Sequence, residues 1–254
     1  MNVGLKAVLL LIVVSWCCII CTAGGAEVGK GYRKAAKEYR FDILVNEPLP
    51  PHLRGKKLPV RDIEAELNLF FEALDDLGEK FVRKSGLKYV MICRDLSRQG
   101  KALSGHTYKE YIYLDVKFKK RTVYHEMFHV FDDKFDNKQW RRLNHPDFRY
   151  HGVIYPQGRK NTAEVQRAEK FKKGFASAYA MSSEREDRAE TFAAMVEEGP
   201  AFVARAEKSK ILYNKMLYII ELTGRNSLLG KDFWPRKLGN AKFGKPAKLK
   251  KQLE

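Results

Sequence analysis

Apolar residues recur at two different spacings along the chain, and each spacing predicts a different kind of element. From position 62 they return every three or four residues and stop before Gly86, which predicts one amphipathic helix on Ile63, Leu67, Phe70, Phe71, Leu74, Leu77 and Phe81. Two shorter runs rich in β-forming residues, 87–93 and 111–116, predict a buried strand and a second strand. The polar segment 96–105 between them predicts a loop.

The second half of the chain predicts helices on either side of a loop-rich connection. A helix is expected over 122–135, followed by a short helix or turn at 140–143 and an irregular segment, 144–160, that contains two prolines and two glycines and looks like a loop over a cleft. A further helix is expected over 184–197, where Gly199 and Pro200 end it. Another carries an apolar side made of Ile211, Leu212, Met216, Leu217 and Ile220.

The first 26 residues have the three parts of a secretory signal peptide. Lys6 precedes the apolar run 7–20, and small residues follow at 22–26, so cleavage is expected after Ala23 or Ala26 and the protein is expected to be secreted. The alternative is an uncleaved N-terminal anchor that tethers the protein to a membrane. The apolar stretch 7–23 is at the short edge of the roughly 20 residues that a spanning helix needs.

Composition fits an ordinary globular protein with an excess of positive charge. Hydrophobic residues make up 44% and charged residues 31% of the 254 positions, which excludes a disordered chain and a polytopic membrane protein. Three of the four cysteines lie in the leader, so Cys93 has no intramolecular disulfide partner after cleavage and is expected to be a small buried side chain on a strand. The 48 Lys and Arg against 31 Asp and Glu give a net charge of +17, which favours binding to polyanions.

Prolines and charge divide the chain into four expected parts. Prolines at 48, 50 and 51 favour extended backbone, so 27–60 is expected to be an N-terminal arm between the 1–26 signal peptide and a 61–225 domain. The remaining 226–254 is expected to be a flexible basic tail, with eight basic residues and two acids from Lys231 onward. This tail could bind an anionic surface or glycan. No aromatic-rich signature of sequence-specific nucleic-acid binding accompanies the charge, and a monomer is expected.

The segment 125–129 (HEMFH) matches the pattern HExxH on the predicted helix 122–135. His125 and His129 lie four residues apart, hence on one face of a helix, where both imidazoles can bind one ion while Glu126 faces the water beside it. Zinc accepts such nitrogen ligands and activates water for peptide hydrolysis near neutral pH. The motif alone leaves open the alternative of two histidines on an ordinary helix.

A catalytic zinc needs a third protein ligand, and the sequence restricts its source. The metzincin continuation would require Gly at 132 and His at 135, where this chain has Asp132 and Phe135. The other common solution is a Glu on a later helix, with a second acid one turn on that hydrogen-bonds a ligand His. Glu186 and Glu190 have this spacing on the predicted helix 184–197. Glu184 is a rival ligand if the register differs.

Two segments together resemble known zinc metallopeptidases. The segments 124–133 (YHEMFHVFDD) and 179–192 (YAMSSEREDRAETF) are similar to the catalytic domain of anthrax-toxin lethal-factor-like peptidases. They also resemble the putative secreted zinc-binding metallopeptidase family, which carries a GF-x-S-x-YA segment, here 174–180, before ED-x-AE-x-F. The stretch 140–148 is similar to the region between the motifs of that family. The resemblance covers roughly residues 85 to 200.

This resemblance implies a role for each motif residue. It implies one zinc ion bound by His125, His129 and Glu186, with Glu126 as general base. Glu190 would orient a ligand His, and Tyr179, seven residues before Glu186, would donate its hydroxyl to the oxyanion or help to hold the leaving amine. From the residues alone, a Tyr that enters a helix is more often a packing residue.

Fold and function follow from the resemblance and the predicted elements together. They imply an α+β, zincin-like fold of the HExxH gluzincin type: a small mixed sheet packs on the HExxH helix, and a mainly helical C-terminal subdomain follows. The expected function is a secreted zinc-dependent endopeptidase that hydrolyses a peptide or protein substrate with metal-activated water and Glu126 as general base. The alternative is a non-catalytic secreted protein that binds metal or polyanions. All five motif positions are intact, which argues against a relic.

Weaker candidates surround this motif set. His145 and His151 lie in the connection between the motifs and could contact substrate, whereas Asp132 and Asp133 could hydrogen-bond a ligand His or cap the helix. Substrate specificity is expected in the connection 144–173 and at an edge strand near 111–116, where a peptide could add as an extra strand.

Overall fold

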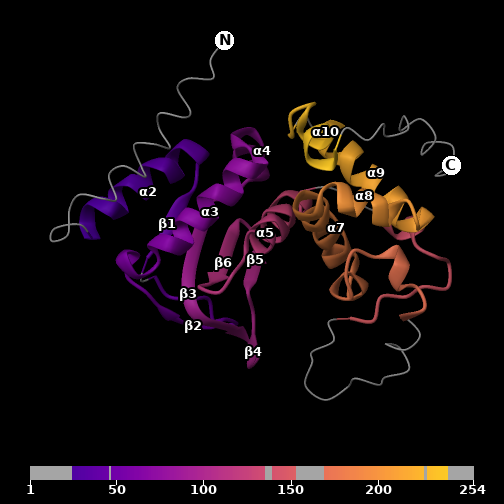
Figure 1. The fold of residues 1–254 in the computed structure, drawn as a ribbon. Coiled ribbons are helices and arrows are strands. Elements are labelled where there is room, and N and C mark those ends of the chain that lie inside the picture. The colour runs from indigo at the N-terminus through magenta and orange to yellow at the C-terminus, as the bar shows by residue number, and fades with distance from the viewer. Residues whose placement is uncertain (1–24, 46, 135–138, 153–168, 226–227, 240–254) are drawn as a thin grey trace, which may run out of the picture.

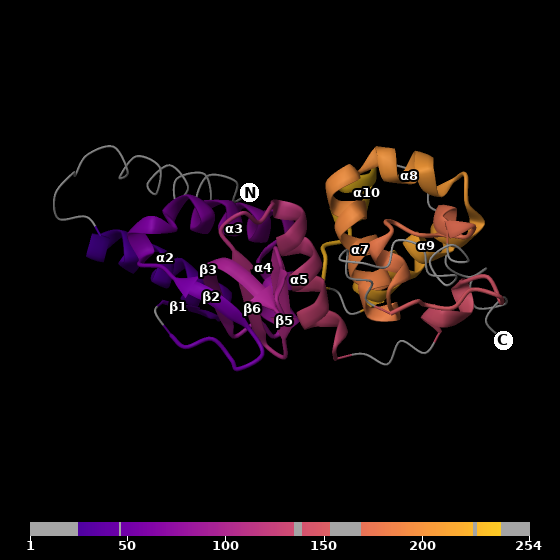
Figure 2. The same ribbon diagram turned by 90° about the horizontal axis from the view of Figure 1, so that it is seen from below.

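A mixed β-sheet with helices builds the N-terminal half of the molecule, and helices alone build the C-terminal half (Figures 1 and 2). The structure is a computed structural model that describes residues 25–45, 47–134, 139–152, 169–225 and 228–239. Of the signal peptide predicted over 1–26, residues 1–24 lie outside this part of the chain. Within the described residues, every helix is too short or too polar to cross a membrane.

The sheet contains β1 (Asp42–Leu44), β2 (Arg54–Lys57), β3 (Tyr89–Arg98), β4 (Lys101–Ala102), β5 (Gly105–Tyr108) and β6 (Tyr111–Asp115). Its main order is β1-β3-β6-β5, with β1 and β6 parallel to β3 and β5 antiparallel to β6. The strands β2 and β4 pair antiparallel with the second half of β3. The segment 111–116 therefore forms an inner strand, and the prediction that it is an edge strand is wrong. The edge is β5.

The predicted loop over 96–105 is also wrong, because β3 continues to Arg98 and turns directly into β4. Gln99 and Gly100 both have positive φ, at 51° and 75°, as a two-residue hairpin turn requires. The polar side chains in this part of β3, such as Arg98, are exposed. Apolar runs alone therefore do not predict this second half of β3.

The apolar run at the start of β3 supplies both faces of the sheet. Val90 and Ile92 belong to the main core under the helices, whereas Met91 and Cys93 pack on the opposite face with Leu53. A strand buried on both sides needs apolar residues at consecutive positions. Cys93 is 1% exposed, so the prediction of a buried small side chain is confirmed.

The helix predicted from position 62 to 81 is two helices, α3 (Glu64–Leu77) and α4 (Glu79–Ser85). Gly78 separates them with φ +86°, a conformation that favours glycine. The apolar spacing continues across the break because both helices pack into the same core. The helix α5 (Lys120–Asp132) follows β6 and contacts both α3 and α4.

The segment 27–60 is part of the domain, which corrects the prediction of an arm. The helix α2 (Gly25–Tyr39) buries Tyr32 and Ala36, Phe41 is 2% exposed, and β1 pairs with β3. The three prolines that favoured an arm lie only in the connection between β1 and β2. The segment packs on the domain because Tyr32, Ala36 and Phe41 bury their apolar surface there.

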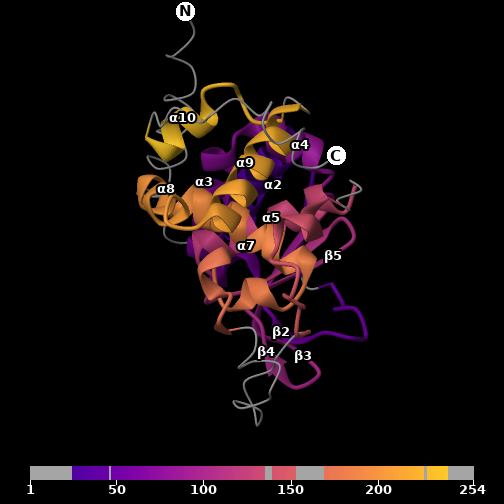
Figure 3. The ribbon, with the colours of Figure 1, turned by 90° about the vertical axis from the view of Figure 1, so that its right-hand side faces the viewer.

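The C-terminal half consists of η2 (Trp140–Leu143), η3 (Lys172–Gly174), η4 (Tyr179–Met181), α7 (Glu184–Glu198), α8 (Pro200–Ala206), α9 (Lys210–Arg225) and α10 (Phe233–Leu238). Figure 3 shows α7 in front of α5, and the two helices are in contact.

The predicted start of the tail at 226 is wrong, because Phe233, Trp234 and Leu238 of α10 are buried in the core. Residues 240–254 lie outside the described residues. The mixed sheet and the helices confirm the α+β class.

Candidate metal centre

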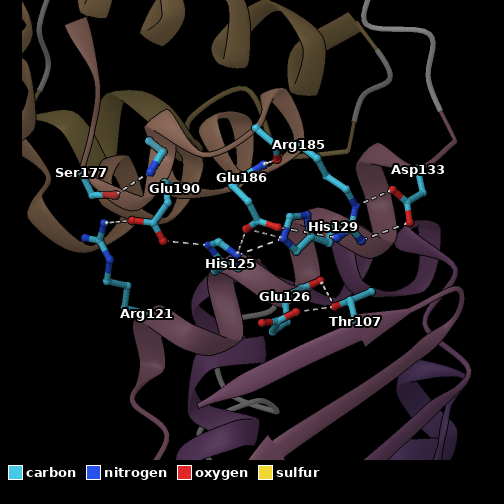
Figure 4. A network of polar contacts seen from close by, with 12 residues as sticks. Thr107, Arg121, His125, Glu126, His129, Asp133, Ser177, Arg185, Glu186 and Glu190 are labelled. Carbon is cyan, nitrogen blue, oxygen red and sulfur yellow. Dashed lines mark hydrogen bonds and ion pairs between the residues drawn. The ribbon is translucent and has the colours of Figure 1, made fainter. Parts of the chain in front are cut away.

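The helices α5 and α7 lie side by side and carry the HExxH histidines and the predicted third ligand (Figure 4). Ser183 caps α7, since its side-chain oxygen accepts a hydrogen bond from the backbone N–H of Glu186 at 3.2 Å. This cap fixes where the helix begins. Glu186 therefore lies in the first turn, and its carboxylate points toward α5.

Three ligand-type atoms from these helices converge. The Nε2 atoms of His125 and His129 are 2.9 Å apart, and Oε2 of Glu186 lies 3.0 Å from the first and 3.2 Å from the second. They form the one metal-ligand group of this kind found within the described residues. The structure thus brings together the two predicted histidines and the predicted glutamate.

The chemistry of this set fits a zinc ion. A neutral imidazole carries one proton, and with both protons on Nδ1 two nitrogen lone pairs and a carboxylate oxygen face one another. Such a cluster of lone pairs is repulsive without a cation. Ligands about 2.0–2.2 Å from a tetrahedral zinc are about 3.3–3.6 Å apart, a few tenths of an ångström more than the separations given above. Two nitrogens and one oxygen are also the ligand types that zinc prefers.

The buried carboxylates strongly perturb the histidines. Burial alone would lower the pKa of His125, but hydrogen bonds to Glu186 and Glu190 outweigh it and raise the pKa to about 10. Burial and the nearby charge of His125 lower the pKa of His129 to about 4. The pKa of Glu186 is lowered, because its hydrogen bonds to both histidines outweigh its burial. Glu186 is therefore ionised near pH 7, as a carboxylate ligand of a metal must be.

Glu190 lies at the ring nitrogen of His125 that points away from the ligand cluster. Its Oε1 lies 2.9 Å from Nδ1 of His125, and its Oε2 accepts a hydrogen bond from Arg121 at 3.0 Å. A carboxylate on the second ring nitrogen fixes the tautomer and the orientation of a ligand His. Arg121 was missed, although it lies one helical turn before His125 and so on the same face of α5. It also pairs with Glu197 at 2.8 Å.

Glu126 lies beside the cluster and faces the sheet edge. Its Oε2 accepts a hydrogen bond from Oγ1 of Thr107 on β5 at 2.6 Å, and the side chains of both residues are buried. Burial raises the pKa of Glu126, while the charge of His125 and the Thr107 hydroxyl act in the opposite direction. A buried carboxylate of raised pKa is suited to accept a proton. Thr107 had no signal in the sequence, because it comes from a distant strand.

Tyr179 lies on the exposed side of the cluster. It is 46% exposed in η4, and its ring centroid is 6.1 Å from that of His125. This exposure does not fit the alternative of a core packing residue.

The weaker candidates are engaged elsewhere. Asp132 accepts a hydrogen bond from Arg188 at 2.8 Å, and Asp133 accepts one from Arg185 at 3.0 Å. Glu184 pairs with Arg141, so the rival register for the third ligand is not observed. His145 packs on Phe171 at 5.0 Å between ring centroids, and Nδ1 of His151 lies 2.6 Å from the carbonyl oxygen of Gly152. Neither imidazole joins the cluster.

Comparison with known proteins identifies a family and a similar fold. Residues 103–232 match the model of a family described as "Putative zinc-binding metallo-peptidase", so the chain belongs to that family. A solved structure of a putative zinc-binding metallo-peptidase from Bacteroides caccae ATCC 43185 is similar in fold, with a TM-score of 0.51 and 16% identity over 87% of this chain and 93% of that one. No curated protein matches the sequence. The resemblance to lethal-factor-like peptidases stays a prediction.

Proposed function

We propose that the protein is a zinc-dependent endopeptidase. The observation that carries the proposal is the convergence of Nε2 of His125, Nε2 of His129 and Oε2 of Glu186 on two adjacent helices. Membership of the zinc-binding metallo-peptidase family supports it. These three residues would hold the metal, and Glu190 would keep His125 in the tautomer that leaves Nε2 free to bind.

The reaction divides between the ion and this chain's own groups. A bound zinc ion supplies a Lewis acid that polarises a peptide carbonyl and makes water a stronger nucleophile. Glu126 takes the proton from the attacking water and returns it to the leaving nitrogen. Tyr179, exposed beside His125, donates its hydroxyl to the oxyanion or to the leaving amine.

Two substitutions test this assignment. Glu126→Gln should retain zinc and lose hydrolysis of a quenched fluorescent peptide library, because the amide cannot accept the proton. Glu186→Ala should lower the zinc content, measured by elemental analysis after dialysis. Glu207→Gln, which changes an exposed carboxylate at the end of α8, is the matched control and should change neither. Hydrolysis that survives in Glu126→Gln would overturn the mechanism.

Two predictions from the termini accompany this proposal. The pattern in 1–26 supports export and cleavage, which N-terminal sequencing of the secreted protein would test. The basic residues of 240–254 support binding to an anionic surface or glycan. Their deletion should weaken retention on heparin, and unchanged retention would exclude the tail from this role.

A further inference from the structure

A cavity of about 490 Å³ lies beside the candidate metal centre, at the edge of the sheet. Its charged and imidazole lining consists of His52, Arg98, His106, Lys109, Asp133 and Arg185. Three cations thus face one carboxylate. With neutral imidazoles the lining carries a formal charge of +2, so the cavity favours an anionic group.

The cavity and the proposed catalytic groups share residues. Thr107 lines the cavity and also donates its hydroxyl to Glu126, and Arg185 precedes Glu186 in α7. Figure 4 shows Thr107 and Glu126 below the histidines. Asp133 and the end of the Arg185 side chain lie to the right of the histidines. A peptide with its scissile bond at Glu126 would therefore have this cavity beside it.

The edge strand β5 forms one wall of the cavity. His106 and Tyr108 are two positions apart, so their side chains leave the same face of the strand. His52 packs against both, with ring centroids 5.7 Å and 5.1 Å away. A peptide that pairs with the outer edge of β5 would run past this wall and past Glu126.

Part of the positive lining has no counter-charge. Arg185 is held by Asp133 through hydrogen bonds of 3.0 and 3.3 Å. Arg98 and Lys109, by contrast, have no ion-pair partner among the described residues; Nζ of Lys109 lies over the ring of Tyr108, 5.5 Å from its centroid. Two cations are therefore free to bind an anion.

The imidazoles add unused hydrogen-bonding capacity. Nε2 of His52 is buried and has no hydrogen-bond partner within the described part of the chain. A buried polar atom of this kind is costly unless a ligand or water satisfies it. Burial, followed by the positive charges of Arg98 and Arg185, lowers the pKa of His106 to about 4, so His106 is neutral near pH 7. A neutral imidazole can donate a hydrogen bond to an anion.

We propose that this cavity is a substrate subsite that binds a carboxylate of the peptide, close to the scissile bond. The inference rests on the proposed peptidase function. A carboxylate accepts charge-assisted hydrogen bonds from Arg and Lys, and it fits between Arg98, Lys109 and the imidazoles. It can come from an Asp or Glu side chain or from the C-terminus of the peptide.

The test measures binding without turnover. The zinc-loaded full chain carrying Glu126→Gln is titrated into fluorescein-labelled decapeptide pools that differ only by Glu or Gln at one fixed position, all with amidated C-termini. Fluorescence polarisation should show a dissociation constant about tenfold lower for Glu at one or two adjacent positions. A second set of Gln pools with free C-termini distinguishes the source of the carboxylate. Preference for these pools assigns the subsite to the chain terminus.

Substitutions tie the preference to the cavity. Arg98→Gln with Lys109→Gln should bring the Glu/Gln ratio to about one and leave binding of the Gln pools unchanged. Arg33→Gln with Lys34→Gln removes the same charges from α2, which packs at the β1 end of the sheet, and should leave the ratio intact. Arg98→Glu should favour Lys at the same peptide position. Thermal melts of all variants check that these exposed substitutions leave the fold intact.

The outcomes separate the subsite from the proposed activity. Equal binding of all the pools, or a preference that survives Arg98→Gln with Lys109→Gln, overturns the subsite. A carboxylate preference in a protein whose parent chain hydrolyses no peptide overturns the peptidase function and leaves the binding site standing. Cleavage by the parent chain with no preference does the reverse.

Discussion

Nζ of Lys215 lies 2.7 Å from Oδ2 of Asp187, and neither side chain has any exposed surface. The same carboxylate oxygen accepts hydrogen bonds from Nε1 of Trp140 at 2.9 Å and from the hydroxyl of Tyr150 at 2.7 Å. Asp187 directly follows Glu186. This buried pair therefore fixes the first turn of α7, and with it the proposed ligand, to α9 and to the segments that precede α7.

Removal of Lys215 alone should strongly destabilise the protein. Lys215→Met leaves the Asp187 carboxylate buried without its cation, which costs about 3–5 kcal/mol of the free energy of unfolding. Urea unfolding of the full chain measures this cost. Lys215→Met combined with Asp187→Leu removes both charges and should be closer to the parent. Lys172→Met, on an exposed lysine, is the control, and a cost below about 1 kcal/mol for Lys215→Met would contradict this account.

Tyr124 should make the protein sensitive to alkali. Burial, and then the hydrogen bond to Asp76 at 2.7 Å, raises the pKa of Tyr124 well above its usual value of about 10. Above pH 10 the unfolded chain loses this proton while the folded chain keeps it, so stability falls as pH rises, by about 1.4 kcal/mol per pH unit. Tyr124→Phe should be less stable at pH 7 and should lose this part of the slope. Tyr213→Phe is the control, and an unchanged slope in Tyr124→Phe would refute the assignment.

Local spacing explains which parts of the site could be predicted. His125 and His129, and likewise Glu186 and Glu190, lie four residues apart, so each pair shares one face of its helix whatever the rest of the fold does. Ser183 starts α7 three residues before Glu186, which is also a local signal. The two helices pack through Phe128 and Phe192, whose ring centroids lie 4.6 Å apart.

Long-range contacts explain what could not be predicted. Thr107 reaches Glu126 only because β5 lies at the edge of the sheet next to α5. Likewise His52, in the turn before β2, meets His106 of β5 although the two are distant in sequence. Lys215 is buried in α9 beside the apolar residues Leu212 and Met216, where its spacing gives no hint of a partner. The aromatic residues of α10 were masked by the basic residues around them. These contacts join segments that are far apart in the sequence, and no regular spacing predicts them.

Arg121 should control metal affinity through Glu190. Arg121→Met removes the hydrogen bond that holds Oε2 of Glu190, so the carboxylate orients His125 less firmly and the zinc dissociation constant should rise about tenfold. Competition with a coloured chelator measures this constant. Arg83→Met, which breaks the ion pair with Glu79 on α4, is the matched control and should leave it unchanged. Equal zinc affinity in Arg121→Met and the parent would show that Glu190 is held without Arg121.

Thr107 should set the acid limb of the activity, if Glu126 is the general base. The Thr107 hydroxyl stabilises the ionised carboxylate, whereas burial disfavours it, so Thr107→Val should raise the pKa of Glu126 further. The base is then protonated at a higher pH, and kcat/KM should fall about tenfold on the acid side of the profile and much less at pH 8. Thr107→Ser keeps the hydroxyl and should restore the limb, while zinc content stays constant in both variants. A uniform loss at every pH would instead show that Thr107 acts on the shape of β5 and not on the charge of Glu126.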